Sequence, residues 1–376
     1  MSNKKLLFVV NDDWFFISHR LPIAIKAKEL GYDVHVATGA YEGESKLEKY
    51  GFTHHVFTIA RAKINPLQDL LTVWSLFSLY KSIKPDVVHH ITIKPVLFGG
   101  IAARLAGIKS VVSAISGLGV IFIDQGFIPS LKRKIVGVLY RLGLSHKNSM
   151  VITQNIDDKK IIARLTGLPN SQLSLIKGSG VDLDKFQMEA LPTDAIRKVV
   201  LLARMLRDKG VGEFHQAAVL LEKDYPNVEF ILAGGIHDNP ASYSENQLND
   251  WNSEGSVQWI GHQSNVIDVI KKAYIIVLPS YREGLPKVLL EAAAIGRPII
   301  TTDVPGCRDA IIENETGLLV PFKNAKALAN AMRKLLDSEE LCKTLGKNGR
   351  LLMEQEFSVD TVVSKHIEIY GNRLSN

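Results

Sequence analysis

Short apolar runs alternate with helix-length segments along the whole sequence, and this pattern constrains the fold more than any other feature. In the first half the runs cover residues 5–10, 32–38, 85–90, 109–114, 149–153 and 173–176. A second set covers residues 199–203, 228–233, 257–260, 274–278, 299–302 and 317–321. Strands that alternate with helices form parallel sheets with helices on both faces. The sequence therefore predicts an α/β protein of two doubly wound, Rossmann-like domains.

The interval between the two sets marks the domain boundary. Residues 187–198 contain Pro192 and mixed polar side chains, as a linker does. A chain of 376 residues is long enough for two domains that each bury a core. We expect an N-terminal domain over residues 1–186 and a C-terminal domain over residues 187–356.

Composition excludes several classes of protein. Hydrophobic residues make up 46% and charged residues 22%, which is ordinary for a globular protein. The two cysteines, Cys307 and Cys342, give neither a disulfide framework nor metal-ligand spacing, which favours a reducing cytoplasm. In the N-terminal half the longest uncharged, mostly apolar segment is the 14 residues of 110–123, whereas a spanning helix needs about 20. No transmembrane segment is predicted.

Charge is distributed unevenly between the halves. Residues 1–190 hold 24 Lys and Arg against 15 Asp and Glu, while residues 191–376 hold 21 against 24. A basic half indicates an anionic membrane surface, a polyanionic substrate, or charge that serves solubility alone. Nucleic acid is excluded as a partner because no nucleic-acid-binding motif accompanies the scattered cations.

Residues 274–291 contain the most informative local pattern. An apolar run ends at Ser280, a short loop carries Glu283 and Gly284, and a helix is predicted from Pro286. A helix N-terminus is a natural seat for phosphate, because its backbone N–H groups are unpaired. Carboxylates accept hydrogen bonds from hydroxyls, so Glu283 and Glu291 could hold the sugar and the ribose of a nucleotide-sugar. Two glutamates at this spacing are common, and the spacing alone favours a solvated loop residue and an ordinary helix residue.

The surrounding sequence resembles the donor site of the retaining glycosyltransferases of family 4, which have the GT-B fold. The shared features are two glutamates separated by seven residues, the Gly-Leu-Pro loop, and the Gly-Arg-Pro turn before the next strand. Arg204 and Lys209 resemble the family's diphosphate clamp, in which two cations stabilise a leaving diphosphate without a metal. The resemblance assigns catalysis to Glu283, Arg204 and Lys209, and donor binding to these together with Gly234, His262, Gly284, Leu285, Pro286, Lys287 and Glu291.

An acceptor site is expected at the carboxyl ends of the N-terminal strands, where open α/β sheets bind ligands. Three loops reach that rim, and they hold the candidates His19, Arg20, His90, Lys94, Ser116 and Gly117. This cationic cluster could bind a lipid diphosphate, although His90 could equally be a packed residue at a strand end. Residues 120–144 combine apolar side chains with the basic triplet 132–134, which suits either an interfacial helix on anionic lipid or a core helix with a solvated first turn.

Family resemblance also implies an activity. The sequences around His19 and Ser116 are similar to those of bacterial enzymes that extend an undecaprenyl-diphosphate-linked sugar during surface glycan assembly. We expect transfer of an N-acetylhexosamine from a UDP-sugar, with no cofactor and no metal, in a cleft between the domains and on the cytoplasmic membrane face. Residues 357–376 would cross back onto the first domain. Asp182 and Asp184 superficially match a metal-binding pair, which we reject because no third acidic ligand is evident.

Two departures and two alternatives accompany this hypothesis. The first loop lacks the Gly-Gly pair of many family members, and Ser116 stands where many have a histidine that touches the donor sugar. The sequence does not identify the base, so a GDP-sugar stays open. A non-hydrolysing UDP-N-acetylglucosamine 2-epimerase shares the fold but needs no acceptor, and the basic, apolar rim argues against it. Retention of Glu283, Glu291, Arg204 and Lys209 argues against a non-catalytic sugar-nucleotide-binding scaffold.

Overall fold

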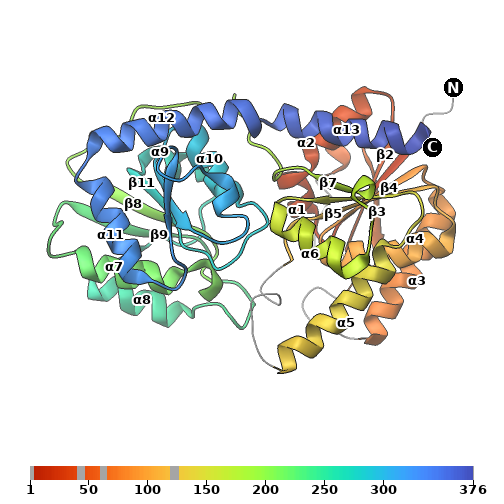
Figure 1. The fold of residues 1–376 in the computed structure, drawn as a ribbon, viewed down its shortest axis with the longest axis horizontal. Coiled ribbons are helices and arrows are strands. Elements are labelled where there is room, and N and C mark those ends of the chain that lie inside the picture. The colour runs from red at the N-terminus through yellow and green to blue at the C-terminus, as the bar shows by residue number, and fades with distance from the viewer. Residues whose placement is uncertain (1–3, 40–46, 60–65, 119–126, 376) are drawn as a thin grey trace. The chain divides into compact units, whose positions relative to one another are not determined.

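The computed structural model describes residues 4–39, 47–59, 66–118 and 127–375, and for residues 127–133 it describes the backbone alone. The chain forms two compact units (Figure 1). One contains Met1–Ser179 and Asp360–Asn376, and the other contains Gly180–Val359. The limits expected from the sequence, after residues 186 and 356, lie a few residues from these.

The described part of the first unit contains a seven-stranded parallel sheet in the order β3-β2-β1-β4-β5-β6-β7. Its strands are β1 Lys5–Val9, β2 Asp33–Gly39, β3 Thr53–Phe57, β4 Val87–Ile91, β5 Ser110–Ile115, β6 Ser149–Thr153 and β7 Leu173–Leu175. The direction of winding reverses between β1 and β4, which are neighbours in register from Leu6 and Val87 onward. A ligand site is therefore expected outside the carboxyl ends of these two strands.

Helices cover both faces of this sheet. They are α1 Asp13–His19, α2 Leu21–Glu29, η1 Glu48–Tyr50, α3 Pro66–Ile83, the π-helical η2 Pro95–Gly99, α4 Gly100–Ala106, α5 Phe127–Leu144, α6 Ile156–Thr166, η4 Asn170–Gln172 and α13 Val359–Ser375. Leu7 and Val9 of β1 pack with the residues of α3 and α4, whereas Phe8 points to the other face and contacts Phe16 and Tyr370. Alternate residues of a central strand are thus buried on opposite sides, as a doubly wound sheet requires.

The second unit contains a six-stranded parallel sheet in the order β10-β9-β8-β11-β12-β13. Its strands are β8 Arg197–Leu202, β9 Val228–Ala233, β10 Gln258–Trp259, β11 Ile275–Leu278, β12 Ile299–Thr302 and β13 Gly317–Val320. Its helices are η5 Arg207–Lys209, α7 Val211–Leu221, α8 Glu245–Glu254, α9 Val266–Lys272, α10 Lys287–Ile295, η6 Arg308–Ala310, α11 Ala325–Leu336 and α12 Glu339–Glu356. Here the winding reverses between β8 and β11, where Val200 is paired with Ile276.

Two hydrophobic clusters lie on opposite faces of this second sheet. Val199 and Leu201 of β8 belong to a cluster with α7 and α11, whereas Val200 belongs to a cluster with α9 and α10. The same alternation holds along β11. The prediction of two doubly wound parallel sheets is confirmed.

Local predictions differ from the structure in three places. Residues 19–30, which precede Gly31 as a possible C-cap, are predicted from the sequence to form one helix, but the structure has two helices that meet at Arg20. The first begins at Asp13, an acidic residue in its first turn. Residues 305–309 are predicted to begin another helix but form only the short turn η6, since Gly306 has a left-handed φ of +83° that no α-helix accommodates. Strand β3 and helix α3 were not predicted.

Candidate active site

Lys209 and Glu283 meet at the point where the second sheet reverses its winding. Lys209 ends the turn η5 that follows β8, and Glu283 lies in the loop that follows β11. Lys209 Nζ forms an ion pair with Glu283 Oε1, and the two side chains are only 15% and 16% exposed. The pair is therefore shielded from water far more than an ordinary surface salt bridge, and its geometry is correspondingly better defined.

Gly210 brings these two loops together. Its φ is +72°, and a Cβ atom there would lie 2.1 Å from the carbonyl oxygen of Pro279. Only glycine combines that backbone conformation with so close an approach. The glycine after Lys209 thus fixes the distance between the clamp loop and the glutamate loop.

Ser280 connects the two loops through its side chain. It is fully buried, and its Oγ lies 2.8 Å from Glu283 Oε1 and 2.9 Å from the carbonyl oxygen of Asp208. The backbone N–H of Tyr281 donates to the same Asp208 carbonyl at 2.8 Å, and the hydroxyl of Thr302 donates to the carbonyl of Ser280. Ser280 was not among the predicted site residues, although it follows the predicted strand directly.

The backbone of Glu283 is held from a third strand. Its N–H donates to the carbonyl of Pro305 at 3.1 Å, in the segment after β12. A Cβ atom on Gly306 would lie 2.4 Å from the carbonyl oxygen of Glu283. Glu283 is consequently positioned by the segments after β8, β11 and β12 together.

Helix α10 begins at Lys287, one residue later than predicted, with Pro286 as an extended N-cap that provides no side-chain hydrogen bond. Glu291 lies one turn into this helix and is 8% exposed. Burial raises the pKa of its carboxyl group, while Lys287 Nζ, 3.4 Å away, acts in the opposite direction. The predicted pair of glutamates therefore differs in environment: Glu283 is paired with a clamp cation, and Glu291 is a largely buried carboxylate on the helix.

The remaining donor candidates lie at the same rim of this sheet. Arg204 follows β8, is exposed, and has no side-chain hydrogen bond or ion pair within the described residues. Gly234 follows β9, and its N–H donates to the carbonyl of Gly261 at 2.8 Å. His262 lies beside Gly235, so the loops after β9 and β10 are in contact. Parallel strands bring all of these loops to one edge.

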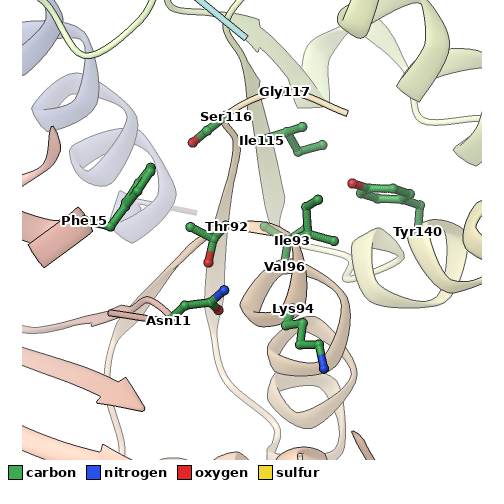
Figure 2. Close-up of a pocket in the computed structure, with 10 residues that line it drawn as sticks. All are labelled: Asn11, Phe15, Thr92, Ile93, Lys94, Val96, Ile115, Ser116, Gly117 and Tyr140. Atoms are coloured by element: carbon green, nitrogen blue, oxygen red, sulfur yellow. The ribbon is translucent and has the colours of Figure 1, made fainter. Parts of the chain in front are cut away.

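A cavity of about 390 Å³ lies at the corresponding rim of the first unit (Figure 2). Its walls come from the segments after β1, β4 and β5 and from helix α5, and the lining residues are Asn11, Phe15, Thr92, Ile93, Lys94, Val96, Ile115, Ser116, Gly117 and Tyr140. Figure 2 shows Phe15 and Tyr140 on opposite sides, with Asn11, Thr92 and Ser116 between them. The expectation that three loops form one rim is confirmed.

Two buried polar atoms of the lining are unsatisfied within the described part of the chain. Asn11 Oδ1 and Ser116 Oγ have no hydrogen-bond partner among the residues that the structure describes. Thr92 has a φ of +70°, a strained conformation for a β-branched residue. Buried polar groups are almost always satisfied and strain collects at functional sites, so both features indicate a ligand site.

The six predicted acceptor residues have different environments. Lys94, Ser116 and Gly117 line the cavity, and Lys94 Nζ is paired with Asp69 Oδ1 at 2.9 Å. His19 is one turn behind the cavity, stacked on Phe15 with ring centroids 4.2 Å apart. Three of the predicted residues, His19, Arg20 and His90, do not line it.

Arg20 and His90 are inside the first unit instead. Arg20 is 1% exposed, its Nη1 donates to the carbonyl of His19, and burial lowers its pKa to about 10. His90 is fully buried with Nε2 2.9 Å from the Tyr80 hydroxyl, and burial lowers its pKa to about 3. Of the cluster inferred from the sequence, Lys94 lines the cavity and His19 is half-buried beside Phe15, and the interpretation of His90 as a packed histidine is the one that fits.

Comparison with known proteins identifies the family. A family model described as "Glycosyl transferase 4-like" matches residues 5–155, and one described as "Glycosyl transferases group 1" matches residues 185–352. A Campylobacter jejuni protein is 31% identical over 381 residues, which span 96% of this chain and 99% of that protein. Its name is N,N'-diacetylbacillosaminyl-diphospho-undecaprenol alpha-1,3-N-acetylgalactosaminyltransferase. The chain belongs to the family 4 glycosyltransferases.

Solved structures agree with this glycosyltransferase in fold. A glycosyltransferase from Rickettsia africae has a TM-score of 0.78 at 19% identity, covering 100% of both chains. Anabaena HepE, solved in complex with UDP and glucose, has a TM-score of 0.78 at 17% identity and covers 98% of this chain and 100% of its own. The predicted GT-B fold is confirmed. Family membership favours the transferase over the epimerase and scaffold alternatives.

Three further observations concern the glycosyltransferase's reactive and acidic side chains. Cys307 is buried, and burial followed by the charge of Glu283 raises its thiol pKa to about 12, which is consistent with a structural role. Asp182 Oδ1 accepts from the backbone N–H groups of Asp184 and Lys185 at 3.1 and 2.9 Å, which makes it a turn residue. No group of three His, Cys, Asp or Glu side chains among the described residues is arranged to hold a metal ion.

The structure describes only part of the segment for which the sequence suggests contact with a membrane. None of the helices in the described ranges is long and apolar enough to span a bilayer. The apolar residues 120–123 and the side chains of Lys132 and Arg133 lie outside the described residues. Lys134 is exposed on α5.

Proposed function

We propose that this glycosyltransferase moves an N-acetylhexosamine from a UDP-sugar to a saccharide carried on undecaprenyl diphosphate, with retention at the anomeric carbon. The observation that carries the proposal is the Lys209–Glu283 pair at the reversal point of the second sheet, beside the start of α10. Support for the substrates comes from the Campylobacter relative, whose name specifies an undecaprenol-diphosphate acceptor and an N-acetylgalactosaminyl group.

Donor binding follows from the chemistry of each side chain. The N-terminus of α10 with Gly284 and Leu285 would hold the diphosphate, with Lys209 and Arg204 neutralising its charge. Glu283 would accept hydrogen bonds from donor-sugar hydroxyls and place the anomeric carbon, and Glu291 would accept those of the ribose. The segments at Gly234 and His262 would lie against the base.

Departure of UDP leaves a negative charge that preorganised donors can stabilise. Lys209 already occupies a defined position through Glu283, so little reorganisation accompanies that step. We propose that no metal takes part. The leaving phosphate, on the same face as the acceptor hydroxyl, would accept its proton.

Acceptor binding is assigned to the cavity of the first unit. Asn11 and Ser116 would bond saccharide hydroxyls or phosphate oxygens, and Lys94 would contribute a cation near the lipid diphosphate. Because such an acceptor is anchored in a bilayer, we propose that the enzyme works as a peripheral protein on the anionic, cytoplasmic face of the membrane. Figure 2 shows the residues concerned.

A donor panel tests the proposal. UDP-N-acetylgalactosamine, UDP-N-acetylglucosamine, UDP-galactose and GDP-mannose are each incubated with a pool of undecaprenyl-diphosphate saccharides, and the products are identified by mass spectrometry. We expect one UDP-N-acetylhexosamine to give a product with an α linkage, at a rate that excess EDTA leaves unchanged.

Three outcomes would contradict parts of this proposal. Loss of activity in EDTA with recovery in manganese would refute the metal-free mechanism. Conversion of UDP-N-acetylglucosamine to its 2-epimer without acceptor would identify an isomerase. Absence of transfer from every donor would refute the enzymatic assignment.

A further inference from the structure

Helix α3 of the first unit has an apolar surface on both sides. Its inner side packs in the core through Leu76, Tyr80 and Ile83. Its outer side presents large apolar residues that are 55–76% exposed, namely Leu67, Leu70, Leu71 and Trp74. Their spacing of three, four and seven residues places them on one stripe of the helix. Single exposed apolar residues are ordinary, but a contiguous stripe of this kind marks an interaction surface.

This outer face of α3 continues beyond the helix itself. A shallow depression of about 660 Å³ is lined by Leu70, Leu71, Val73, Trp74, Phe77 and Leu105, the last of which belongs to α4. Trp74 and Phe77 stack with ring centroids 5.5 Å apart, and Lys81 Nζ lies 5.8 Å from the centre of the Phe77 ring. The surface is apolar at its centre and cationic at one end.

Helix α5 also has exposed apolar residues at helical spacing. Ile135, Val138 and Leu142 are 42–58% exposed and lie three and seven residues apart. Arg104 of α4 donates to the Ser145 hydroxyl, which itself donates to the carbonyl of Leu142 at 3.0 Å, so α4 is tied to the end of α5. Helices α3, α4 and α5 lie together in the first unit (Figure 1).

The charge of these helices indicates which kind of partner binds this surface. Among the side chains that the structure describes, α3, α4 and α5 carry four exposed cations, Lys81, Arg104, Lys134 and Arg141, and a single acidic residue, Asp69. Asp69 is buried and paired with Lys94, so it offers no exposed negative charge. A second copy of the chain would bring two cationic surfaces together. An anionic bilayer supplies both the apolar interior and the negative charge that these helices lack.

We propose that the outer face of α3, Leu67, Leu70, Leu71, Trp74 and Phe77, inserts into the interfacial region of an anionic bilayer, with Arg104, Lys134 and Arg141 at the headgroups. This inference rests on the proposed lipid-linked acceptor. One contact links this helix to the acceptor cavity: Asp69, on its inner side, is paired with Lys94. Docking through α3 would therefore bring the cavity close to the headgroup plane where a lipid diphosphate lies.

Vesicle binding tests this surface directly. The full chain is sedimented with vesicles of phosphatidylglycerol and phosphatidylethanolamine, and separately with phosphatidylcholine vesicles. We expect binding to the anionic vesicles only, and a loss of at least tenfold in apparent affinity for the double variant Leu70→Glu/Trp74→Glu. The matched control is Val219→Glu/Leu220→Glu, two exposed apolar residues of α7 in the other unit, which should bind as wild type does. Melting curves of both variants establish that they fold.

Transfer to a water-soluble acceptor with a short prenyl chain separates this inference from the proposed function. The double variant should retain its rate on that acceptor and lose it on undecaprenyl-linked acceptor in vesicles. Wild-type affinity of the double variant for vesicles would overturn the inference. Loss of transfer to the short acceptor would also overturn it, because that result would place α3 within the acceptor site. A third contrary result would be a wild-type dimer that the double variant converts to a monomer without any effect on vesicle binding. Vesicle binding without transfer to any acceptor would refute the function and leave the docking surface standing.

Discussion

Lys209 and Glu283 are 74 residues apart in sequence and form an ion pair at the ends of two adjacent strands. The strands are adjacent because the winding of the second sheet reverses between β8 and β11. The topology therefore joins two motifs that the sequence presents separately, the clamp lysine and the first glutamate. Ser280 and the close approaches at Gly210 and Gly306 then hold the pair in one geometry.

Removing either member of this pair should abolish most of the turnover while leaving the fold intact. We expect Lys209→Ala and Glu283→Gln each to lower kcat by about 10² to 10³, the loss typical of a deleted electrostatic donor at a reacting centre. Initial rates with saturating donor and circular dichroism are the measurements.

A second lysine–glutamate pair in the same unit provides the control. Lys271, which is on α9, pairs with Glu189. This pair lies away from the carboxyl ends of the strands. Lys271→Ala should keep the wild-type rate. Equal losses in Lys271→Ala and Lys209→Ala would mean that the assay reports stability, and a wild-type rate in Glu283→Gln would remove Glu283 from the site.

Ser280→Ala should impair positioning without removing a group that touches substrate. The variant loses the hydroxyl between Glu283 and Asp208, while the Asp208 carbonyl keeps its bond from the Tyr281 N–H. A lost hydrogen bond of about 1 to 2 kcal/mol predicts a fall in kcat of about 5- to 30-fold with a nearly unchanged KM for donor. Ser253→Ala, which removes an exposed hydroxyl on α8, is the control. A rise in KM alone would instead assign Ser280 to donor binding.

Gly306→Ala should disturb Glu283 through its backbone. Gly306 and Gly255 have nearly the same left-handed φ, +83° and +84°, but a Cβ atom meets the Glu283 carbonyl at Gly306 and nothing within 4 Å at Gly255. Both alanine variants carry the backbone cost of about 1 kcal/mol, and only Gly306→Ala adds a steric clash. We expect loss of activity in Gly306→Ala alone. Matching activity in the two variants would show that the loop after β12 moves freely.

Much of this arrangement could be predicted from the sequence because it depends on local patterns. Apolar runs of strand length identify both sheets. Because the carboxyl ends of parallel strands lie at one edge of a sheet, the loops with Arg204, Glu283 and Gly234 are expected at that edge. The N-terminus of α10 was predicted to within one residue, since Pro286 has no backbone N–H to bond to a preceding helical turn.

The remainder depends on contacts between distant segments. No local signal indicates that Ser280 bonds to the Asp208 carbonyl, or that Gly306 touches Glu283. Arg20 and His90 were predicted at a rim because each lies near a strand end, whereas the structure buries both. For His90 a signal existed: Val87, Val88 and Ile91 make β4 apolar on both sides, as in a central strand. The apolar outer stripe of α3 was present in the sequence but was not recognised, because the helix was not predicted.

Ser116→Ala should affect the acceptor and leave the donor unchanged. Its hydroxyl is buried at the cavity and has no partner among the described residues, so the folded enzyme without ligand gains little from it. We expect a rise of about tenfold in KM for the lipid-linked acceptor, equivalent to about 1.4 kcal/mol, with an unchanged rate of donor hydrolysis. Ser113→Ala, a buried serine of β5 that does not line the cavity, is the control. A changed KM for donor would place Ser116 beside the donor sugar, where the family histidine acts.

Acidification should destabilise the first unit through three buried histidines. Burial lowers the pKa of His89, His90 and His366, to about 3 for the last two, and the neighbouring Arg20 acts in the same direction on His89 and His366. Because the folded pKa values lie below the ordinary 6.5, the unfolded chain takes up protons first as the pH falls. The stability is fully present above pH 6.5 and declines below it, continuing toward pH 3.

The magnitude follows from linkage. Each of these histidines should cost on the order of 1 kcal/mol of unfolding free energy at pH 5.5 relative to pH 7.5. Urea unfolding at the two pH values measures the difference, and His366→Gln should reduce it by about that amount whatever its effect on stability at pH 7.5. The control, His237→Gln, replaces a histidine at an exposed position. If His366→Gln leaves the difference unchanged, His366 takes up no proton on unfolding, and the carboxyl groups rather than this histidine govern the acid response.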